Sequence, residues 1–218
     1  MEEKNKIKDE SEADPSRLGV DSEAEEKFTA GRQSLAKAAK FFVEFLETAI
    51  VIGVIAFIIR FFLVQPFVVE GASMEPNFHN NDYLLIEKIS ERIKSPKRGD
   101  VIVFRYPNNP KVNYIKRIVG VPGDTITIKD GNLKITPAGS NQEKTVTEAY
   151  LPKDIKTSGD TKIKVENDQL FVLGDNRGNS SDSREWGILP KKNIIGRAWL
   201  IVLPANDFGI VPRVKYNF

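Results

Sequence analysis

Residues 100–137 read DVIVFRYPNNPKVNYIKRIVGVPGDTITIKDGNLKITP. Short runs rich in Val, Ile, Tyr, Phe and Thr alternate in it with the turn signals NNP, VPGD and DGN. Similar runs flank it, with FVVEG and DYLLIEKI before it and TKIKVE, QLFVLGD and IIGRAWLIVLP after it. We therefore expect a mostly β fold, arranged as an antiparallel sandwich or barrel-like domain.

The β-rich part divides into a core and an insertion. Residues 131–168 are more polar and rich in Lys, Thr and Asp, which is typical of a hairpin-rich insertion. We expect residues 1–40 to form a disordered extension, because the first 26 residues contain ten Asp or Glu and no apolar periodicity. The remaining boundaries are a β core over 65–130 and 169–204, the smaller inserted β region over 131–168, and a C-terminal tail over 205–218.

A hydrophobic segment precedes the β-rich part. Residues 41–64 read FFVEFLETAIVIGVIAFIIRFFLV and are uncharged from Thr48 to Ile59. Glu44 and Arg60 stand sixteen residues apart, which on a helix is roughly 24 Å and close to the hydrocarbon thickness of a bilayer. We predict one N-terminal transmembrane helix over 41–64. The alternative is a buried helix of a soluble core, because the uncharged stretch is shorter than about eighteen residues.

Charges beside this segment predict its orientation. Residues 61–87 contain no Lys or Arg, whereas four cations and no acid stand between residues 27 and 40, at Lys27, Arg32, Lys37 and Lys40. By the positive-inside rule the N-terminus is cytoplasmic and everything after Val64 is extracytoplasmic. A cleaved secretory signal is disfavoured, since the hydrophobic segment begins about forty residues into the chain. We expect a single-pass protein of the plasma membrane.

Composition limits the available chemistry. The 218 residues include 32 basic and 30 acidic ones, so no cationic excess exists to neutralise a phosphate backbone, and nucleic acid is not an expected partner. The chain has no cysteine and one histidine, which excludes cysteine nucleophiles and multi-histidine metal sites. We expect no metal and no cofactor. His79, in NFHNND, is interpreted as an exposed loop residue, so a serine nucleophile would need another base.

Ser73 is the candidate nucleophile. It stands in GASMEP, residues 71–76, where two small residues precede it and leave the hydroxyl uncovered. Its own N–H could face an oxyanion. The alternative is a turn serine that merely bonds its own backbone.

Lys116 is the candidate base. It stands in NYIKRIVGV, residues 113–121, where strand alternation sends Lys116 and Arg117 to opposite faces, so we expect one of these two cations to point inward. Burial disfavours the charged ammonium and can lower the pKa of a lysine by several units from about 10.4. The neutral amine can then accept a serine proton. The alternative is an exposed lysine on the open face of the sheet.

A third cluster, GDNRGNSSDSREWG, occupies residues 174–187. Its two carboxylates and two guanidiniums can form mutually neutralising pairs that brace a lysine, or weak ion pairs of a surface loop. Ser180 offers an uncharged hydroxyl that could hydrogen-bond a lysine amine without raising its pKa. The four charged positions are Asp175, Arg177, Asp182 and Arg184.

Three motifs follow the hydrophobic segment, in the order GASMEP, YIKRIVGVPGD and GDNRGNSSDSREWG. Together they resemble the motifs of type I signal peptidases, which remove signal peptides from exported proteins. The resemblance covers about residues 41–204. It implies signal-peptide-bearing preproteins, the lipid bilayer and the protein export machinery as partners. It also implies a catalytic β domain in which Ser73 is the nucleophile and Lys116 is the general base. The supporting residues implied by the resemblance are Ser180, Asp182 and Arg184, with Ser180 beside the lysine.

Two positions depart from the family pattern. Many bacterial members carry a serine two positions before the nucleophile, whose hydroxyl helps hold the oxyanion, and this chain has Gly71 there. We expect the oxyanion to rely on backbone N–H groups or another donor. The family also usually has threonine after the motif proline, where this chain has Asn77. The small Gly71 and Ala72, with Met74 as an apolar neighbour, suit narrow pockets for small substrate side chains such as Ala.

Two other functions stay open at this point. One is an anchored β domain that binds exported chains without cleaving them. The other is self-cleavage by the same Ser-Lys chemistry, as in SOS-response repressors, although those carry a DNA-binding helical domain in place of the hydrophobic segment. We favour acyl transfer to water, in which Ser73 attacks a peptide carbonyl, Lys116 takes the proton, and water activated by the same lysine hydrolyses the acyl-enzyme.

Overall fold

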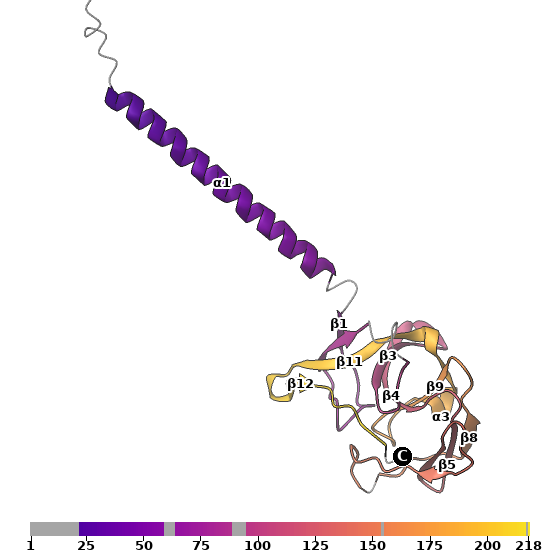
Figure 1. Cartoon of the computed structure of the whole chain (residues 1–218). Coiled ribbons are helices and arrows are strands. Elements are labelled where there is room, and N and C mark those ends of the chain that lie inside the picture. Colours follow the sequence, from indigo (N-terminus) through magenta and orange to yellow (C-terminus); the bar gives the residue numbers. More distant parts are fainter. Residues whose placement is uncertain (1–21, 59–63, 89–94, 154, 217) are drawn as a thin grey trace, which may run out of the picture. The chain divides into compact units, whose positions relative to one another are not determined.

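The computed structural model describes the chain except for residues 1–21, 59–63, 89–94, 154 and 217. The chain divides into two compact units, Met1–Ile55 and Ala56–Phe218, and each is described by itself. The first contains most of one long helix, α1 (Ser22–Ile58), and the second is rich in strands (Figure 1). The elements of the second unit are β1 (Val64–Val68), β2 (Tyr83–Glu87), β3 (Val101–Tyr106), β4 (Asn109–Gly120), β5 (Thr125–Lys129), β6 (Asn132–Thr136), β7 (Lys144–Thr145), β8 (Thr161–Lys164), β9 (Gln169–Leu173), α3 (Ser183–Trp186), β10 (Leu189–Pro190), η3 (Lys191–Asn193), β11 (Ile194–Leu203), η4 (Ala205–Asp207) and β12 (Gly209–Ile210).

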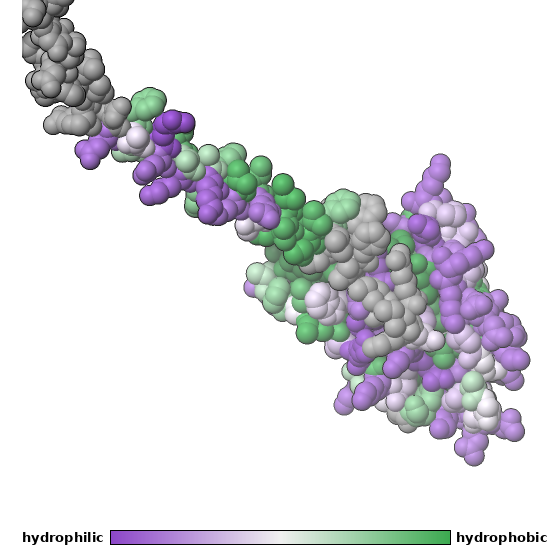
Figure 2. All heavy atoms as spheres, turned by 45° about the horizontal axis from the view of Figure 1, so that its top comes forward, coloured by the Kyte–Doolittle hydropathy of each residue, from purple (hydrophilic) through white to green (hydrophobic). Residues whose placement is uncertain are grey.

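Helix α1 is 37 residues long and changes character along its length. Its first half is rich in Ala, Glu and Lys, which favour helix strongly. The helix therefore takes in residues 22–40 of the extension that the sequence predicted to be disordered, while residues 1–21 lie outside the described chain. Beyond that point large apolar side chains from Phe41 to Phe57 are exposed. Figure 2 shows this change from hydrophilic to hydrophobic surface along the helix.

The predicted transmembrane helix over 41–64 falls partly on undescribed residues. Its residues 59–63 lie outside the described chain. Among the helices that the structure describes, none combines the length and the apolar character needed to cross a membrane.

Two antiparallel sheets form the β unit. The larger sheet has the strand order β1-β2-β11-β3-β4-β9-β10, with β12 added beside β11, and the smaller has the order β7-β6-β5-β8. Every strand pair in both sheets is antiparallel. The predicted mostly β, antiparallel architecture is confirmed.

Strand β3 lies inside the larger sheet and is buried on both faces. Val101 and Val103 belong to one hydrophobic cluster, whereas Ile102 and Phe104 belong to another. Because successive strand residues point to opposite faces, the run VIVF must have apolar packing on both sides. A third cluster, built largely from β5, β6 and β9, lies beneath the smaller sheet.

The inserted region begins earlier than the sequence indicated. The hairpin of β5 and β6 turns at Asp130 and Gly131, whose φ angles of 53° and 78° are both positive, as a two-residue Asp-Gly hairpin requires. Since β5 pairs with β6 and β8 in the smaller sheet, the boundary falls near residue 125 instead of 131. The expected tail over 205–218 also joins the fold, because β12 pairs with β11 and Val211 is 4% exposed.

Candidate active site

Ser73 lies in the turn between β1 and β2. The turn bends at Gly71, whose φ of +88° suits glycine, and whose N–H donates to Asn80 Oδ1 at 2.8 Å. Asn176, from the third sequence cluster, holds the turn twice: its N–H donates to Ser73 O at 3.1 Å and its side-chain amide donates to Ala72 O at 3.0 Å. The serine backbone is therefore fixed by a segment about one hundred residues away in sequence.

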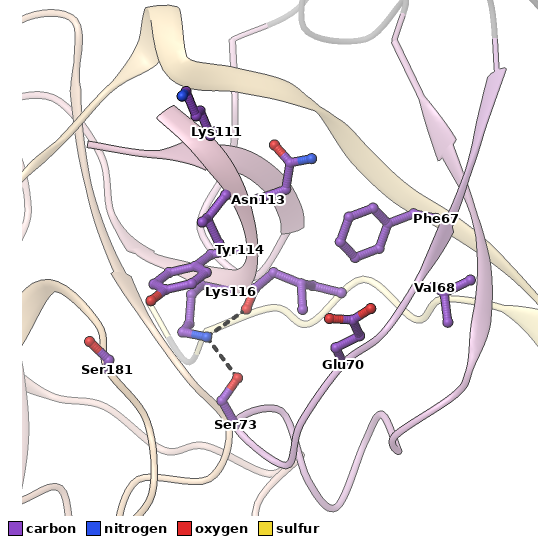
Figure 3. Close-up of a pocket in the computed structure, with 11 residues that line it drawn as sticks. Phe67, Val68, Glu70, Ser73, Lys111, Asn113, Tyr114, Lys116 and Ser181 are labelled. Carbon is purple, nitrogen blue, oxygen red and sulfur yellow. Dashed lines mark hydrogen bonds between the residues drawn. The ribbon is translucent and has the colours of Figure 1, made fainter. Parts of the chain in front are cut away.

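Lys116 lies on β4 and is brought to Ser73 by the sheet. Its Nζ lies 2.7 Å from Ser73 Oγ, and it donates to Ile115 O at 2.9 Å. Figure 3 shows the amine pointing at the serine hydroxyl. The Tyr114 ring centroid is 5.2 Å from Nζ, and Lys116 as a whole is 3% exposed. Two residues 43 positions apart thus form a hydrogen-bonded pair in which the lysine is buried and the serine is half-buried.

Burial lowers the pKa of the Lys116 ammonium group. Desolvation lowers its pKa from 10.5 to about 8, although the nearby carboxylates of Asp182 and Asp175 oppose this shift. At pH 7 about one amine in ten is then uncharged. A lysine with this pKa can serve as a proton acceptor near neutral pH, which an exposed lysine cannot.

A pocket of about 480 Å³ opens beside the pair. Phe67, Val68 and Glu70 line it from β1 and the turn that follows, and residues 111–116 line it from β4 (Figure 3). Strand β1 is the first strand in the order of the larger sheet, so its outer edge has no neighbour among the strands that the structure describes. An edge strand beside a pocket offers free backbone groups to an extended peptide.

Arg117 is buried as well, on the opposite face of β4. It makes a bidentate pair with Asp175, at 2.8 and 2.6 Å, and its guanidinium carbon lies 4.2 Å from the Tyr150 ring centroid. We expected one of the two adjacent cations to point inward, and both are buried, because β4 has a packed layer on each face. Lys116 stands opposite Ile102 of β3, which is fully buried, so the two residues share a covered face of the sheet.

The supporting residues form a second fixed group. Asp182 is fully buried, caps α3, and accepts from Gly174 N–H at 3.0 Å. Its carboxylate also accepts from Arg184 Nε and Nη2, both at 2.8 Å. Ser180 Oγ is buried near the pair but has no hydrogen-bond partner among the described residues. The structure therefore contains no bond between Ser180 and Lys116, whose partners are Ser73 and Ile115.

Sequence reasoning missed part of the network around this group. Arg177 is 2% exposed and forms a bidentate pair with Glu148, while its Nη2 also donates to the Tyr150 hydroxyl at 3.1 Å. Asn77 donates to Tyr150 O and to Asp175 Oδ2, at 3.1 and 2.9 Å. Glu148 and Tyr150 stand in the polar inserted region, where no local pattern marks them. Only the fold brings them to the cluster.

Two further sequence candidates lie away from the pocket. Met74 is fully buried in a hydrophobic cluster of the core, and it is not part of the pocket lining. His79 is exposed, and its ring lies within 4.8 Å of carboxylate oxygens of Asp82 and Asp207. This is a group of metal-binding residue types outside the pocket, and the chemistry of Ser73 does not use it.

Comparison with known proteins identifies relatives for most of the chain. The family model described as "Signal peptidase, peptidase S26" matches residues 42–203. Signal peptidase I P of Bacillus subtilis subsp. natto is 36% identical over 174 residues, which cover 75% of this chain and 90% of that protein. Signal peptidase I of Leptolyngbya laminosa is 37% identical over 180 residues, covering 79% and 85%. A crystal structure of a signal peptidase I from Enterococcus faecalis has 30% identity and a TM-score of 0.40, covering 48% of this chain and 97% of that one.

These matches, on a mostly β fold, define the chain as a serine peptidase. It belongs to the signal peptidase family, peptidase S26. The resemblance seen in the three sequence motifs is thereby confirmed.

Proposed function

We propose that the protein is a membrane-anchored endopeptidase that removes N-terminal signal peptides from exported preproteins, with Ser73 as nucleophile and Lys116 as general base. The observation that carries the proposal is the distance of 2.7 Å between Ser73 Oγ and the buried Nζ of Lys116. A nucleophile and its base must be within hydrogen-bond reach before a proton can pass between them.

In the proposed mechanism the neutral Lys116 amine takes the proton as Ser73 Oγ attacks the scissile carbonyl. The ammonium then gives this proton to the leaving amine, which completes the acyl-enzyme. Water enters, loses a proton to the same amine and attacks the ester, and the ammonium returns this proton to Ser73 Oγ as the ester bond breaks. The buried pairs Arg117–Asp175 and Arg184–Asp182 support the cycle, because each arginine neutralises a carboxylate that would otherwise raise the pKa of Lys116 further.

The oxyanion donor in this proposal is the backbone N–H of Ser73. It has no acceptor within the described part of the chain, whereas the N–H of Gly71 is already bonded to Asn80. A backbone N–H that is fixed and unpaired beside the nucleophile can stabilise the charge that develops on the carbonyl oxygen. This donor would replace the serine hydroxyl that many relatives carry at position 71.

A membrane location on the extracytoplasmic side completes the proposal. The apolar side chains between Phe41 and Phe57 are exposed along α1, and the hydrophobic sequence continues to Val64. Exposed apolar surface of this extent needs a lipid or protein partner. Ser73 follows Val64 by nine residues, so an extended link reaches at most roughly 30 Å beyond the anchor. A preprotein held by its own signal segment would present its cleavage site at a similar height.

The decisive experiment measures preprotein cleavage by the full chain in detergent. We expect Ser73→Ala and Lys116→Met each to lower kcat/KM by about a thousandfold or more, because each removes a member of one catalytic unit. Matched controls come from the same pocket: Ser181→Ala and Lys111→Met change the same residue types on its lining. These controls should stay within about tenfold of the wild type, since neither touches the pair.

Equal losses in the pair and in the controls would contradict the assignment of nucleophile and base. Failure of the wild-type protein to release a mature product from any preprotein would instead favour a binding domain without peptidase activity.

A further inference from the structure

A second concave site lies away from the Ser73 pocket, at one end of the larger sheet. It has a volume of about 380 Å³. Its lining comes from the start of β1, the ends of β2 and β3, η3, and the start of β11. The strand register explains why these segments meet. Glu87 of β2 pairs with Val64 of β1 and with Arg197 of β11, and Ile194 of β11 pairs with Phe104 of β3. These ends of the four strands therefore lie at the same end of the sheet.

Among the residues that the structure describes, four cations and no carboxylate line this site, which we call the basic pocket. They are Lys88, Arg105, Lys191 and Lys192. The buried arginines of this protein are, in contrast, each matched to an acid, in the pairs Arg117–Asp175, Arg177–Glu148 and Arg197–Glu87.

The cations of the basic pocket have almost no internal partners. Lys191 has one loose contact, 3.7 Å to Asp168, whose side chain is 91% exposed. No ion pair joins the side chains of Lys88, Arg105 or Lys192 to any residue that the structure describes. Like charges that converge without compensation favour an anion between them.

In the sequence, one residue of the basic pocket directly follows the proposed anchor. Gln65, which lines the pocket, follows Val64 directly, and Val64 is the last residue of the hydrophobic segment. Consecutive Cα atoms are about 3.8 Å apart. If the segment over 41–64 crosses the bilayer, one wall of the pocket therefore lies where the chain leaves the membrane, at the level of the phosphate groups.

We propose that the basic pocket binds the phosphate of an anionic phospholipid headgroup and so fixes the catalytic unit on the membrane surface. The proposal rests on the proposed function for its membrane location. Arg105 supplies a planar fork that suits phosphate oxygens, and the three lysines supply point charges. Each cation near an anionic surface adds favourable energy that salt weakens.

The test uses the full chain in a neutral detergent, with the thermal unfolding midpoint followed by tryptophan fluorescence. Three probes are titrated below their micelle-forming concentrations: a short-chain phosphatidylglycerol, the matching phosphatidylcholine, and inorganic phosphate. A ligand that binds only the folded state raises the midpoint. We expect the phosphatidylglycerol to raise it at the lowest concentration and added salt to weaken its effect.

The variants separate this pocket from general surface charge. Lys191→Gln with Lys192→Gln should weaken phosphatidylglycerol binding by at least about tenfold, and Arg105→Gln is a second, independent variant. The control, Lys129→Gln with Lys153→Gln, removes the same charge from exposed positions outside the pocket and should bind as the wild type does.

Equal responses to the two lipids would overturn the proposal. It would also be overturned if inorganic phosphate bound as tightly as the anionic lipid, because the pocket would then be a site for free anions. Loss of binding in the control, or retention in both pocket variants, would also overturn it. Preprotein cleavage in the same samples keeps the two proposals apart. Absent wild-type cleavage counts against the peptidase function, whereas the lipid titration alone decides the basic pocket.

Discussion

Lys116 owes its chemistry to its surroundings. Its strand could be predicted from alternation in NYIKRIVGV, and its partner could be predicted only through family resemblance, because 43 residues separate it from Ser73. Its lowered pKa could not be predicted from local sequence, since it arises from burial beneath residues of other strands. The same limit explains why the burial of Arg117 was not predicted, since strand alternation does not reveal the second packed layer.

Ser180 offers a test at the residue scale. Its hydroxyl is buried without a partner, so Ser180→Ala should leave the unfolding midpoint unchanged or raise it, because a buried unpaired hydroxyl costs about 1–3 kcal/mol. If the hydroxyl bonds the lysine during turnover, kcat should fall by about ten- to a hundredfold. Thermal unfolding and cleavage kinetics on one preparation measure both effects.

Ser183 is the matched control for this substitution. Its Oγ accepts from Val172 N–H at 3.0 Å in the core, so Ser183→Ala should lower the midpoint. A destabilised Ser180→Ala variant with unchanged kcat would show that the Ser180 hydroxyl is structural and has no part in the reaction.

At the scale of elements, the turn of the nucleophile depends on the segment that follows β9. Asn176 bonds both Ser73 O and Ala72 O, and Gly174 lies so close that an added Cβ would be 2.4 Å from Ser73 O and 2.1 Å from Ser180 Oγ. The sequence marked both segments as motifs, yet their contact could not be deduced from either motif alone.

Gly174→Ala should therefore displace the nucleophile turn, lowering kcat/KM by about a hundredfold or more, since small displacements of reacting groups cost about that much. Gly178→Ala is the control in the same loop, because a Cβ there meets nothing within 4 Å. Cleavage kinetics and a thermal unfolding curve for each variant are the measurements. Similar kinetics for both variants would show that the close approach at Gly174 does not position Ser73.

At the scale of the whole molecule, the sequence predicted a mostly β fold and the short strands that build it. It did not predict how distant segments close the structure. The inserted region contributes Glu148 and Tyr150 to the buried network, and burial raises the pKa of Tyr216 in the C-terminal segment, which lies beside Tyr150. Such contacts depend on the final packing of both sheets, and polar residues in irregular segments show no periodic pattern that reveals them.

The C-terminal segment should accordingly contribute to stability. Val211 is 4% exposed and packs in the core with Met74, whereas the neighbouring Ile210 is 69% exposed. We expect Val211→Ala to lower the unfolding midpoint by about 4–8 °C, because it removes buried methyl groups, and Ile210→Ala to change it by no more than about 2 °C. Equal midpoints for the two variants would mean that this segment is not packed as described.

The proposed chemistry requires that a fraction of the Lys116 amines beside Ser73 be uncharged near neutral pH. Its most direct test is an NMR titration of the full chain labelled with ¹³C at the lysine ε-carbons, with the Lys116 signal assigned by its absence in Lys116→Met. We predict a pKa of about 8 for Lys116, and a kcat/KM that rises with pH through the same value, because the neutral amine of the free enzyme accumulates above it. A Lys116 signal that titrates near 10.5, the ordinary value for lysine, would contradict the account.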